Sequence, residues 1–179
     1  MKNKLAGSQT EKNLWEAYAG ESKARNKYTY FASKAKKEGY VQMSKIFEET
    51  AANEKEHAKI WFKLLDGISD TAKNLKNSME NEYYEWTEMY PYFAKTAKEE
   101  GFNDIAKLFE MVADIERTHF ERYAKLLENI ENRKVLESDK EEIWQCSNCG
   151  HIIVGKKITE ACPVCNHSKD YFEIKASNY

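Results

Sequence analysis

The sequence feature that most constrains the fold is an internal repeat. The motif Glu-x-x-His occurs at Glu54–His57 and again, 62 positions later, at Glu116–His119. The offset extends over about forty positions and also aligns Tyr28 with Tyr90, Phe31 with Phe93, Gly39 with Gly101 and Phe47 with Phe109. We interpret the repeat as a duplication, so the two halves are expected to fold alike.

Each half of the repeat has the pattern of a helix pair. Apolar residues recur at steps of three and four, and the chain has only two prolines and seven glycines, as long helices require. Ser8 and Glu11 have the spacing of a capping box, which predicts the start of the first helix. Glycines are expected to end the first three helices, at Gly39, Gly67 and Gly101. The sequence therefore predicts an all-α region of four helices, the third capped by Ser69, Asp70 or Thr71.

The two halves differ in length by one residue within the first helix of each pair. Glu21 precedes Tyr28 by seven residues, whereas Glu82 precedes Tyr90 by eight. One extra residue in an otherwise aligned helix predicts a π-bulge, a feature that often occurs at functional sites. Pro91 would also disturb the helical hydrogen bonds at this point.

Acidic residues interrupt the apolar stripe of every predicted helix. Glu-x-x-His places a carboxylate and an imidazole one turn apart on one helix face, where both can reach one metal ion. Buried carboxylates without cations would each cost several kcal/mol or become protonated, whereas two divalent metals would offset most of the charge. The expected ligands of two metal ions are Glu21, Glu54, His57, Glu82, Glu85, Glu116 and His119.

This ligand set is rich in oxygen and has one imidazole for each metal, which is the pattern of ferritin-like di-iron and di-manganese four-helix bundles. The residues alone leave alternatives open. Helix phase could leave individual acids in solvent, and a hydrolytic two-metal site has similar ligands, although no Lys or Arg cluster for phosphate lines these stripes. Tyr28 and Tyr90 lie near the acids in phase, either as core aromatics or as groups that hydrogen-bond the ligands or relay electrons.

All four cysteines lie near the C-terminus in two Cys-x-x-Cys pairs, Cys146 with Cys149 and Cys162 with Cys165. Four thiolates select tetrahedral zinc or iron. Zinc is favoured by the ligands alone, because zinc ribbons have the same spacing, whereas iron is favoured by the neighbouring redox-competent bundle. His151 and His167 flank the pairs but are surplus to four sulfurs.

Composition narrows the partners and the compartment. The 179 residues have a net charge of −2, which argues against a nucleic-acid partner. No apolar run follows Met1–Lys4, so we expect no signal peptide, and no stretch is apolar enough for a membrane span. Paired cysteines without a targeting segment indicate metal binding in a reducing cytoplasm.

The helical period ends before the cysteines. Residues 131–143 are charged and have no clear stripe, so they are expected to form a linker or a fraying helix end. Short apolar runs at Ile152–Val154 and Tyr171–Ile174 predict strands around the cysteines. We therefore expect two domains, a ferritin-like four-helix bundle over residues 1–138 and a small β-rich domain with a four-cysteine metal site over residues 139–179.

With both sites placed, the chain resembles rubrerythrin over nearly its whole length. The matching segments are Ala19–Ser22, Asn53–Ala58, Glu82–Trp86, Met89–Pro91 and Glu116–His119, followed by the rubredoxin-like segments Trp144–Gly150 and Cys162–Cys165. The resemblance implies a cytoplasmic peroxidase that reduces hydrogen peroxide to water at a di-iron centre and protects against oxidative stress. One further iron in the four-cysteine site would pass electrons in, ultimately from NAD(P)H through a separate reductase or rubredoxin.

The same resemblance implies a role for each ligand. Glu54 and Glu116 would bridge the irons, Glu21 and Glu85 would bind one iron, and Glu82 with His119 the other. On reduction, the first iron would exchange Glu85 for His57. Every one of these positions is filled in this sequence by the residue type that the family pattern requires.

The short link between the second and third helices has a geometric consequence. In the family's bundle these helices run parallel, so their connection must return along the bundle. The path from Glu54 to Asp66 and from Thr71 back to Glu82 is roughly 34 Å at about 1.5 Å per residue, whereas residues 67–70 span at most about 14 Å. We therefore expect a domain-swapped homodimer in which each di-iron centre takes ligands from both chains.

Two other functions use the same motifs. A ferritin-like protein could oxidise and store Fe²⁺, but storage needs a large hollow shell, for which the four-cysteine domain gives no reason. A zinc-ribbon adaptor with a merely structural bundle would leave the buried carboxylates unexplained. We therefore expect the peroxidase, with ferroxidase or iron handling as the alternative.

Overall fold

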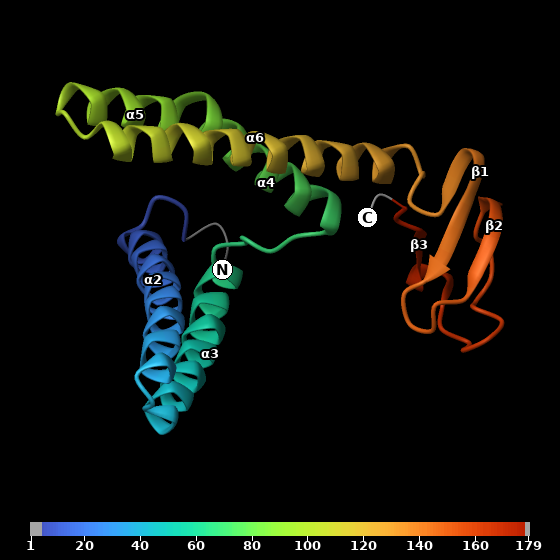
Figure 1. The fold of residues 1–179 in the computed structure, drawn as a ribbon, viewed down its shortest axis with the longest axis horizontal. Coiled ribbons are helices and arrows are strands. Elements are labelled where there is room, and N and C mark those ends of the chain that lie inside the picture. Colours follow the sequence, from blue (N-terminus) through green and yellow to red (C-terminus); the bar gives the residue numbers. More distant parts are fainter. Residues whose placement is uncertain (1–4, 178–179) are drawn as a thin grey trace. The chain divides into compact units, whose positions relative to one another are not determined.

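The computed structural model describes residues 5–177, so the opening Met1–Lys4, on which the expectation of no signal peptide partly depends, lies outside it. The chain forms two compact units, Met1–Ser69 and Asp70–Tyr179, and each is described by itself. Helices come first and a small sheet follows (Figure 1). The predicted class, an all-α region of four helices followed by a small β-rich domain, is confirmed.

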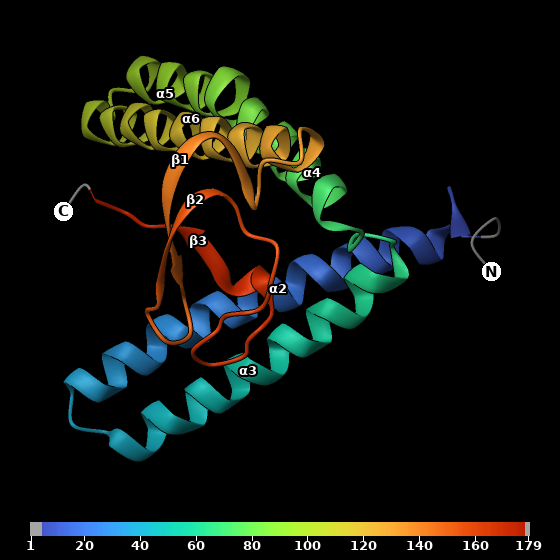
Figure 2. The same cartoon turned by 90° about the vertical axis from the view of Figure 1, so that its right-hand side faces the viewer.

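The first unit is a helical hairpin of α2 (Gln9–Lys37) and α3 (Val41–Leu64), which lie side by side in both ribbon views (Figures 1 and 2). Ser8 caps α2 as predicted, since its hydroxyl accepts from the Glu11 amide at 3.1 Å. The Glu11 carboxylate reaches back to the amide of Gly7 rather than that of Ser8, at 2.6 Å. Gly39, with φ of 86°, makes the turn between the helices.

The helical part of the second unit comprises α4 (Thr71–Tyr84), η1 (Glu85–Met89), α5 (Tyr90–Glu99) and α6 (Asn103–Glu131). Asp70 caps α4 by accepting from the Lys73 amide at 2.9 Å. The predicted third helix is therefore α4, η1 and α5 in succession. Because η1 is a single π-helical turn at the extra residue, the predicted π-bulge is confirmed.

Small residues fill the seams within the helical pairs. Ala32 and Ala35 are buried in the first unit, Ala94 and Ala97 occupy the repeated positions in the second, and buried Ser44 corresponds to fully buried Ala106. Such small side chains let two helices approach closely. Within each unit, the seam therefore combines small buried residues with aromatic contacts such as Phe31 with Phe47 and Phe93 with Phe109.

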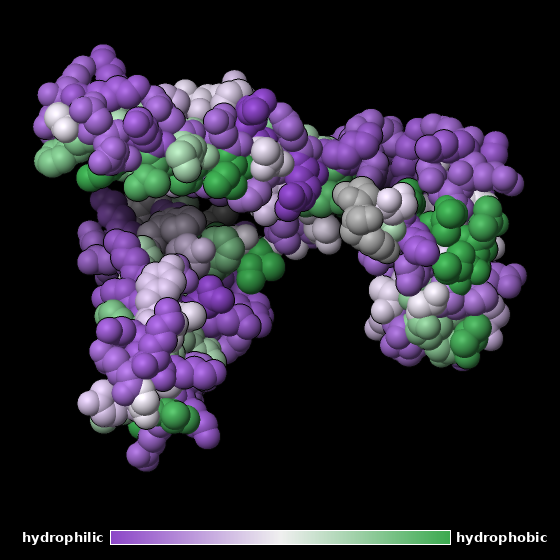
Figure 3. Space-filling model, viewed as in Figure 1, coloured by the Kyte–Doolittle hydropathy of each residue, from purple (hydrophilic) through white to green (hydrophobic). Residues whose placement is uncertain are grey.

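Large apolar side chains of the stripe lie on a face that neither helical unit covers itself. The repeat-related pairs Phe31 and Phe93, Met43 and Ile105, and Ile46 and Leu108 expose between 38% and 57% of their surface. Figure 3 shows hydrophobic side chains exposed along the α5–α6 pair. An apolar face of this extent on a helical pair needs a further element to cover it.

The C-terminal part is a three-stranded antiparallel sheet in the order β2-β1-β3, formed by β1 (Glu137–Cys146), β2 (Ile152–Lys157) and β3 (Phe172–Ile174). The turn η2 (Lys169–Tyr171) leads into β3. Trp144 and Phe172 pack with Cys146 and Cys162 in a core of their own. The strands predicted near the cysteines are thus confirmed.

The prediction that residues 131–143 form a linker or a fraying helix end is wrong for most of that segment. Helix α6 ends at Glu131, but β1 begins at Glu137 and pairs with Lys157 on β2. The first residues of β1 are mostly exposed and charged, so they lack the apolar alternation by which a strand is recognised in sequence. Backbone pairing with β2, rather than side-chain burial, defines this part of the strand.

Candidate metal centres

The first unit brings together three of the predicted ligands. Glu21 lies on α2, and Glu54 and His57 lie one turn apart on α3; their ligand atoms are all within 4.8 Å of one another. His57 Nδ1 is 2.8 Å from a Glu54 carboxylate oxygen and 3.9 Å from one of Glu21. Two carboxylates thus converge on one imidazole.

The second unit repeats this arrangement with the equivalent residues. Glu82 on α4 and Glu116 and His119 on α6 have ligand atoms within 4.8 Å of one another. His119 Nδ1 lies 2.7 Å from a Glu116 oxygen and 3.7 Å from one of Glu82. The two units therefore hold equivalent groups of two carboxylates and one imidazole, each a candidate metal-ligating group.

Glu85 is the first residue of η1 and has no acidic counterpart in the first half. Burial, followed by the charge of Glu116, raises the pKa of the Glu85 carboxyl above its ordinary value. Burial likewise raises the pKa of Glu82, helped by its hydrogen bond to Glu116. These nearby negative charges favour proton uptake or a bound cation, but Glu85 lies outside the group of ligand atoms that Glu82, Glu116 and His119 bring within 4.8 Å of one another.

The two tyrosines lie on the same stripes as the acids. Burial raises the pKa of the Tyr90 phenol, and the charges of Glu85, Glu116 and Glu82 raise it further, so this hydroxyl is held protonated beside the carboxylates. Tyr28 packs between Phe31 and Phe47, with ring centroids 6.4 and 6.2 Å away. The aromatic packing of Tyr28 is an observation, whereas a functional role for either tyrosine stays a prediction.

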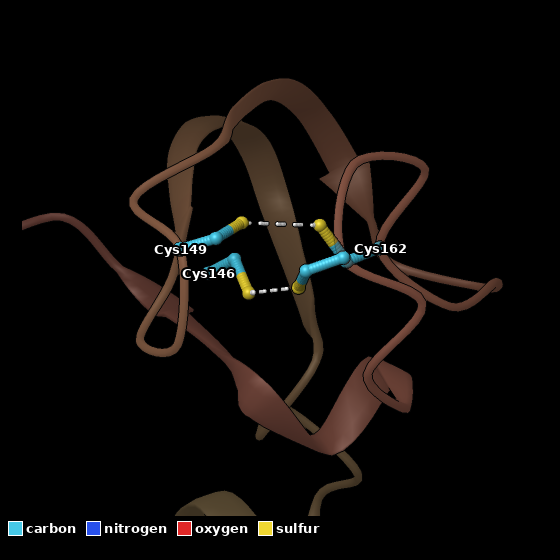
Figure 4. A group of neighbouring side chains, drawn as sticks. Cys146, Cys149 and Cys162 are labelled. Carbon is cyan, nitrogen blue, oxygen red and sulfur yellow. Dashed lines mark hydrogen bonds between the residues drawn. The ribbon is translucent and has the colours of Figure 1, made fainter.

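The four cysteines converge between two loops (Figure 4). Their sulfurs lie within 4.8 Å of one another, with Cys149 and Cys162 at 3.6 Å and Cys146 and Cys165 at 3.8 Å. All four are free thiols. Four converging thiols without a disulfide are the donor set of a tetrahedral metal ion.

The thiols interact strongly when they hold protons. The His151 backbone amide favours the Cys149 thiolate, but burial and hydrogen bonds from the other three thiols outweigh it and raise the pKa of Cys149 to about 12. The His167 backbone amide, helped by neighbouring thiols, lowers the pKa of Cys165 to about 6. A first negative charge thus settles on Cys165, and a metal ion is required to remove the last proton near neutral pH.

The residue after each cysteine pair takes part in the site, and the sequence analysis missed this role for Asn166. Gly150 and Asn166 both adopt positive φ, of 78° and 57°. Their backbone amides donate hydrogen bonds of 2.8 Å to the backbone carbonyl oxygens of Cys146 and Cys162. Glycine and asparagine are the residues that best tolerate this conformation. Their occurrence directly after both pairs was the available signal.

Comparison with known proteins identifies the family. A family model described as rubrerythrin matches residues 12–127, and a second, described as the rubredoxin-like domain of rubrerythrin, matches residues 144–173. The chain belongs to the rubrerythrin family. It is 47% identical to rubrerythrin of Porphyromonas gingivalis, over 100% of this chain and 96% of that one. It is 46% identical to rubrerythrin-1 of Clostridium acetobutylicum, over 98% of each.

Membership of the rubrerythrin family explains why two kinds of metal site occur together. The family is one of iron-containing proteins of oxidative stress. The Glu and His groups supply a di-iron site in the ferritin-like helices, and the four cysteines supply the metal site of the rubredoxin-like domain. None of the helices described is both long and apolar enough to cross a membrane.

Proposed function

We propose that this chain reduces hydrogen peroxide to water. The observation that carries the proposal is that one chain holds both a duplicated carboxylate–imidazole ligand set and a tetrathiolate site. Bound iron would supply reversible one-electron chemistry at both. Reduction of peroxide takes two electrons and two protons, so a site for substrate and a separate entry for electrons are both required.

The chain's own side chains would hold the metals and the protons. By the family resemblance, Glu54 and Glu116 would hold both irons, Glu21 and Glu85 would hold one of them, and Glu82 and His119 the other; His57 would take the place of Glu85 on reduction. The raised pKa of Tyr90, caused by burial and by the nearby acids, suits a hydroxyl that stays protonated and donates a hydrogen bond to a ligand or to a substrate oxygen.

Electrons would enter at Cys146, Cys149, Cys162 and Cys165 from a reductase or rubredoxin that draws on NAD(P)H. Cys149 is exposed and Cys165 is partly exposed, so a redox partner can approach the sulfurs closely. Free thiols in this arrangement suit a reducing compartment, and we place the protein in the cytoplasm.

Each complete di-iron centre would combine half-sites from two chains. Helix α3 ends at Leu64 and α4 begins at Thr71, and backbone hydrogen bonds fold Asp66 and Gly67 back onto α3. Reaching Glu82 from Glu54 in a parallel arrangement requires about 31 Å, whereas the six linking residues reach about 20 Å when fully extended. A domain-swapped homodimer removes this conflict and also covers the exposed apolar faces of both helical pairs.

The experiment that tests the activity follows the visible absorption of ferric thiolate. Iron-loaded protein is reduced without oxygen, and two equivalents of hydrogen peroxide per chain are added, so that the iron pair alone cannot supply all the electrons. Rapid return of the colour is expected, because electrons leave the four-cysteine iron for peroxide. The Glu56→Ala variant, which removes an exposed acid paired with Lys59 on the same helix, should behave like the parent.

The matched test variant is Glu54→Ala with Glu116→Ala, in which the colour should return far more slowly. If the parent is as slow as this variant, peroxide is not reduced through the carboxylate site, and iron oxidation becomes the better hypothesis. Measuring particle mass then separates a dimer or tetramer from a storage shell.

A further inference from the structure

An aromatic cluster of Tyr83, Trp86 and Phe120 adjoins the acidic half-site of the second unit. Trp86 directly follows Glu85, and Phe120 directly follows His119. The ring centroids of Tyr83 lie 5.8 Å from Trp86 and 5.5 Å from Phe120, and those of Trp86 and Phe120 are 6.5 Å apart. The three rings therefore form one continuous contact that begins beside two predicted ligands.

The two oxidisable rings of this cluster differ in exposure. The Trp86 indole nitrogen is buried and has no hydrogen-bond partner in the part of the chain that the structure describes. Tyr83 is 49% exposed and meets the Trp86 ring edge-on. The Trp86 end of the cluster is thus dry and is joined to Glu85 through a single peptide bond, and the Tyr83 end is in contact with water.

This difference in exposure determines which of the two rings is left oxidised. An indole that loses one electron normally gives up its N–H proton, but Trp86 has no acceptor among the residues described, so the proton stays and the ring remains a strong oxidant. Tyr83 can replace the lost electron and release its phenolic proton to water. The unpaired electron then resides on Tyr83, at the surface.

We propose that Trp86 and Tyr83 form a one-electron path that carries an electron from the protein surface to the di-iron site when only one stored electron remains for a second peroxide. The inference rests on the proposed function. A fully reduced chain would store three electrons, two at the iron pair and one at the four-cysteine iron, whereas each peroxide takes two. A second peroxide therefore finds one electron missing.

The missing electron comes from Tyr83 through Trp86. In this step hydrogen peroxide would take one electron from the four-cysteine site, one electron and one proton from Tyr83, and one proton from solvent water. It would yield two waters, and the water that gave up its proton would remain as hydroxide. Tyr83 is left as a neutral phenoxyl radical in contact with solvent. A one-electron reductant of the thiol class restores its hydrogen atom.

Trp61 provides a matched control within the same chain. Its indole nitrogen is likewise buried without a partner, but no aromatic ring contacts Trp61 among the residues that the structure describes. Tyr30 is a second control, since 66% of it is exposed and no tryptophan contacts its ring in the described part of the chain. Neither Trp61 nor Tyr30 should support the path.

The test uses full-length, iron-loaded, fully reduced protein mixed with two equivalents of hydrogen peroxide and frozen rapidly. Electron paramagnetic resonance is expected to show a tyrosyl radical, and peptide mapping should find oxidation at Tyr83. Tyr83→Phe should abolish the signal, and Trp86→Phe should prevent its formation at Tyr83. Trp61→Phe and Tyr30→Phe should leave it unchanged; circular dichroism checks that each variant folds, and Trp86→Leu replaces Trp86→Phe if needed.

The outcomes separate the two proposals. If peroxide is consumed but no radical forms, or if the radical survives Tyr83→Phe or Trp86→Phe, the path is refuted while the peroxidase stands. If the parent protein does not consume peroxide, both proposals fail.

Discussion

Mixing two defective variants tests whether each metal centre draws its ligands from two chains. One variant carries Glu54→Ala in the first unit and the other carries Glu116→Ala in the second. In a swapped dimer that contains one chain of each kind, one centre receives both lesions and the other receives none. A centre built within a single chain always contains one lesion, whichever chains pair.

The expected magnitude follows from this count. Mixed dimers isolated with two different affinity tags should hold about half the di-iron centres of the parent protein, because one of the two centres is intact. The assay is iron content per dimer together with the rate at which peroxide restores the ferric-thiolate colour. Each variant alone should lack iron beyond that of its four-cysteine sites, and its colour should return far more slowly than that of the parent protein. If the mixed dimers also lack the di-iron centres and the rapid colour return, the domain swap is refuted. The end of α3 or the start of α4 would then have to unwind to lengthen the link at residues 65–70.

The remaining predictions concern protons and packing. Metal-free protein should become more stable as the pH falls from neutral toward 4.5, the ordinary pKa of a glutamate, because the raised pKa of Glu82 and Glu85 makes the folded state bind more protons than the unfolded chain; urea midpoints should show this slope, and Glu82→Gln with Glu85→Gln should flatten it. Zinc binding to the metal-free four-cysteine site should release protons at neutral pH and tighten as the pH rises, because the pKa of Cys149 is raised to about 12; a titration with a pH indicator measures both, and a proton count independent of pH would contradict it. Ala106→Leu should cost about 1–3 kcal/mol of unfolding free energy, because no space surrounds this fully buried methyl group; Lys107→Leu, at the exposed neighbouring position, should not.

Local signals in the sequence predicted most of the helical structure. Ser8 and Asp70 cap helices because a short polar side chain can accept from an amide three residues on, and this rule needs no tertiary information. The π-turn was predictable because two copies of one helix differ by a single residue. The metal-ligating groups were predictable because Glu-x-x-His fixes two side chains on one helix face.

What the sequence did not predict depends on partners distant along the chain. The start of β1 is held by backbone pairing to Lys157, about twenty residues away, and its own side chains are mostly solvated. The residues of the apolar stripes were expected to be buried, but Met43 and Leu108 stay exposed within their own units, while Ala32, Ala94 and Ala106 are buried. A periodic pattern shows that a face must be covered but not which element covers it.

The π-turn explains how two equal halves came to carry unequal ligand sets. Before the turn, the halves align with an offset of 61, which pairs Glu21 with Glu82; after it the offset is 62, which pairs Tyr28 with Tyr90. An extra residue in a regular helix would rotate all later side chains by about 100°. The π-turn absorbs that residue, so Tyr90 and Phe93 keep their contacts with Phe109, as Tyr28 and Phe31 keep theirs with Phe47. The turn begins at Glu85, where the first half has Ala24 at an offset of 61 or Lys23 at an offset of 62, so the second half gains a carboxylate without losing its packing.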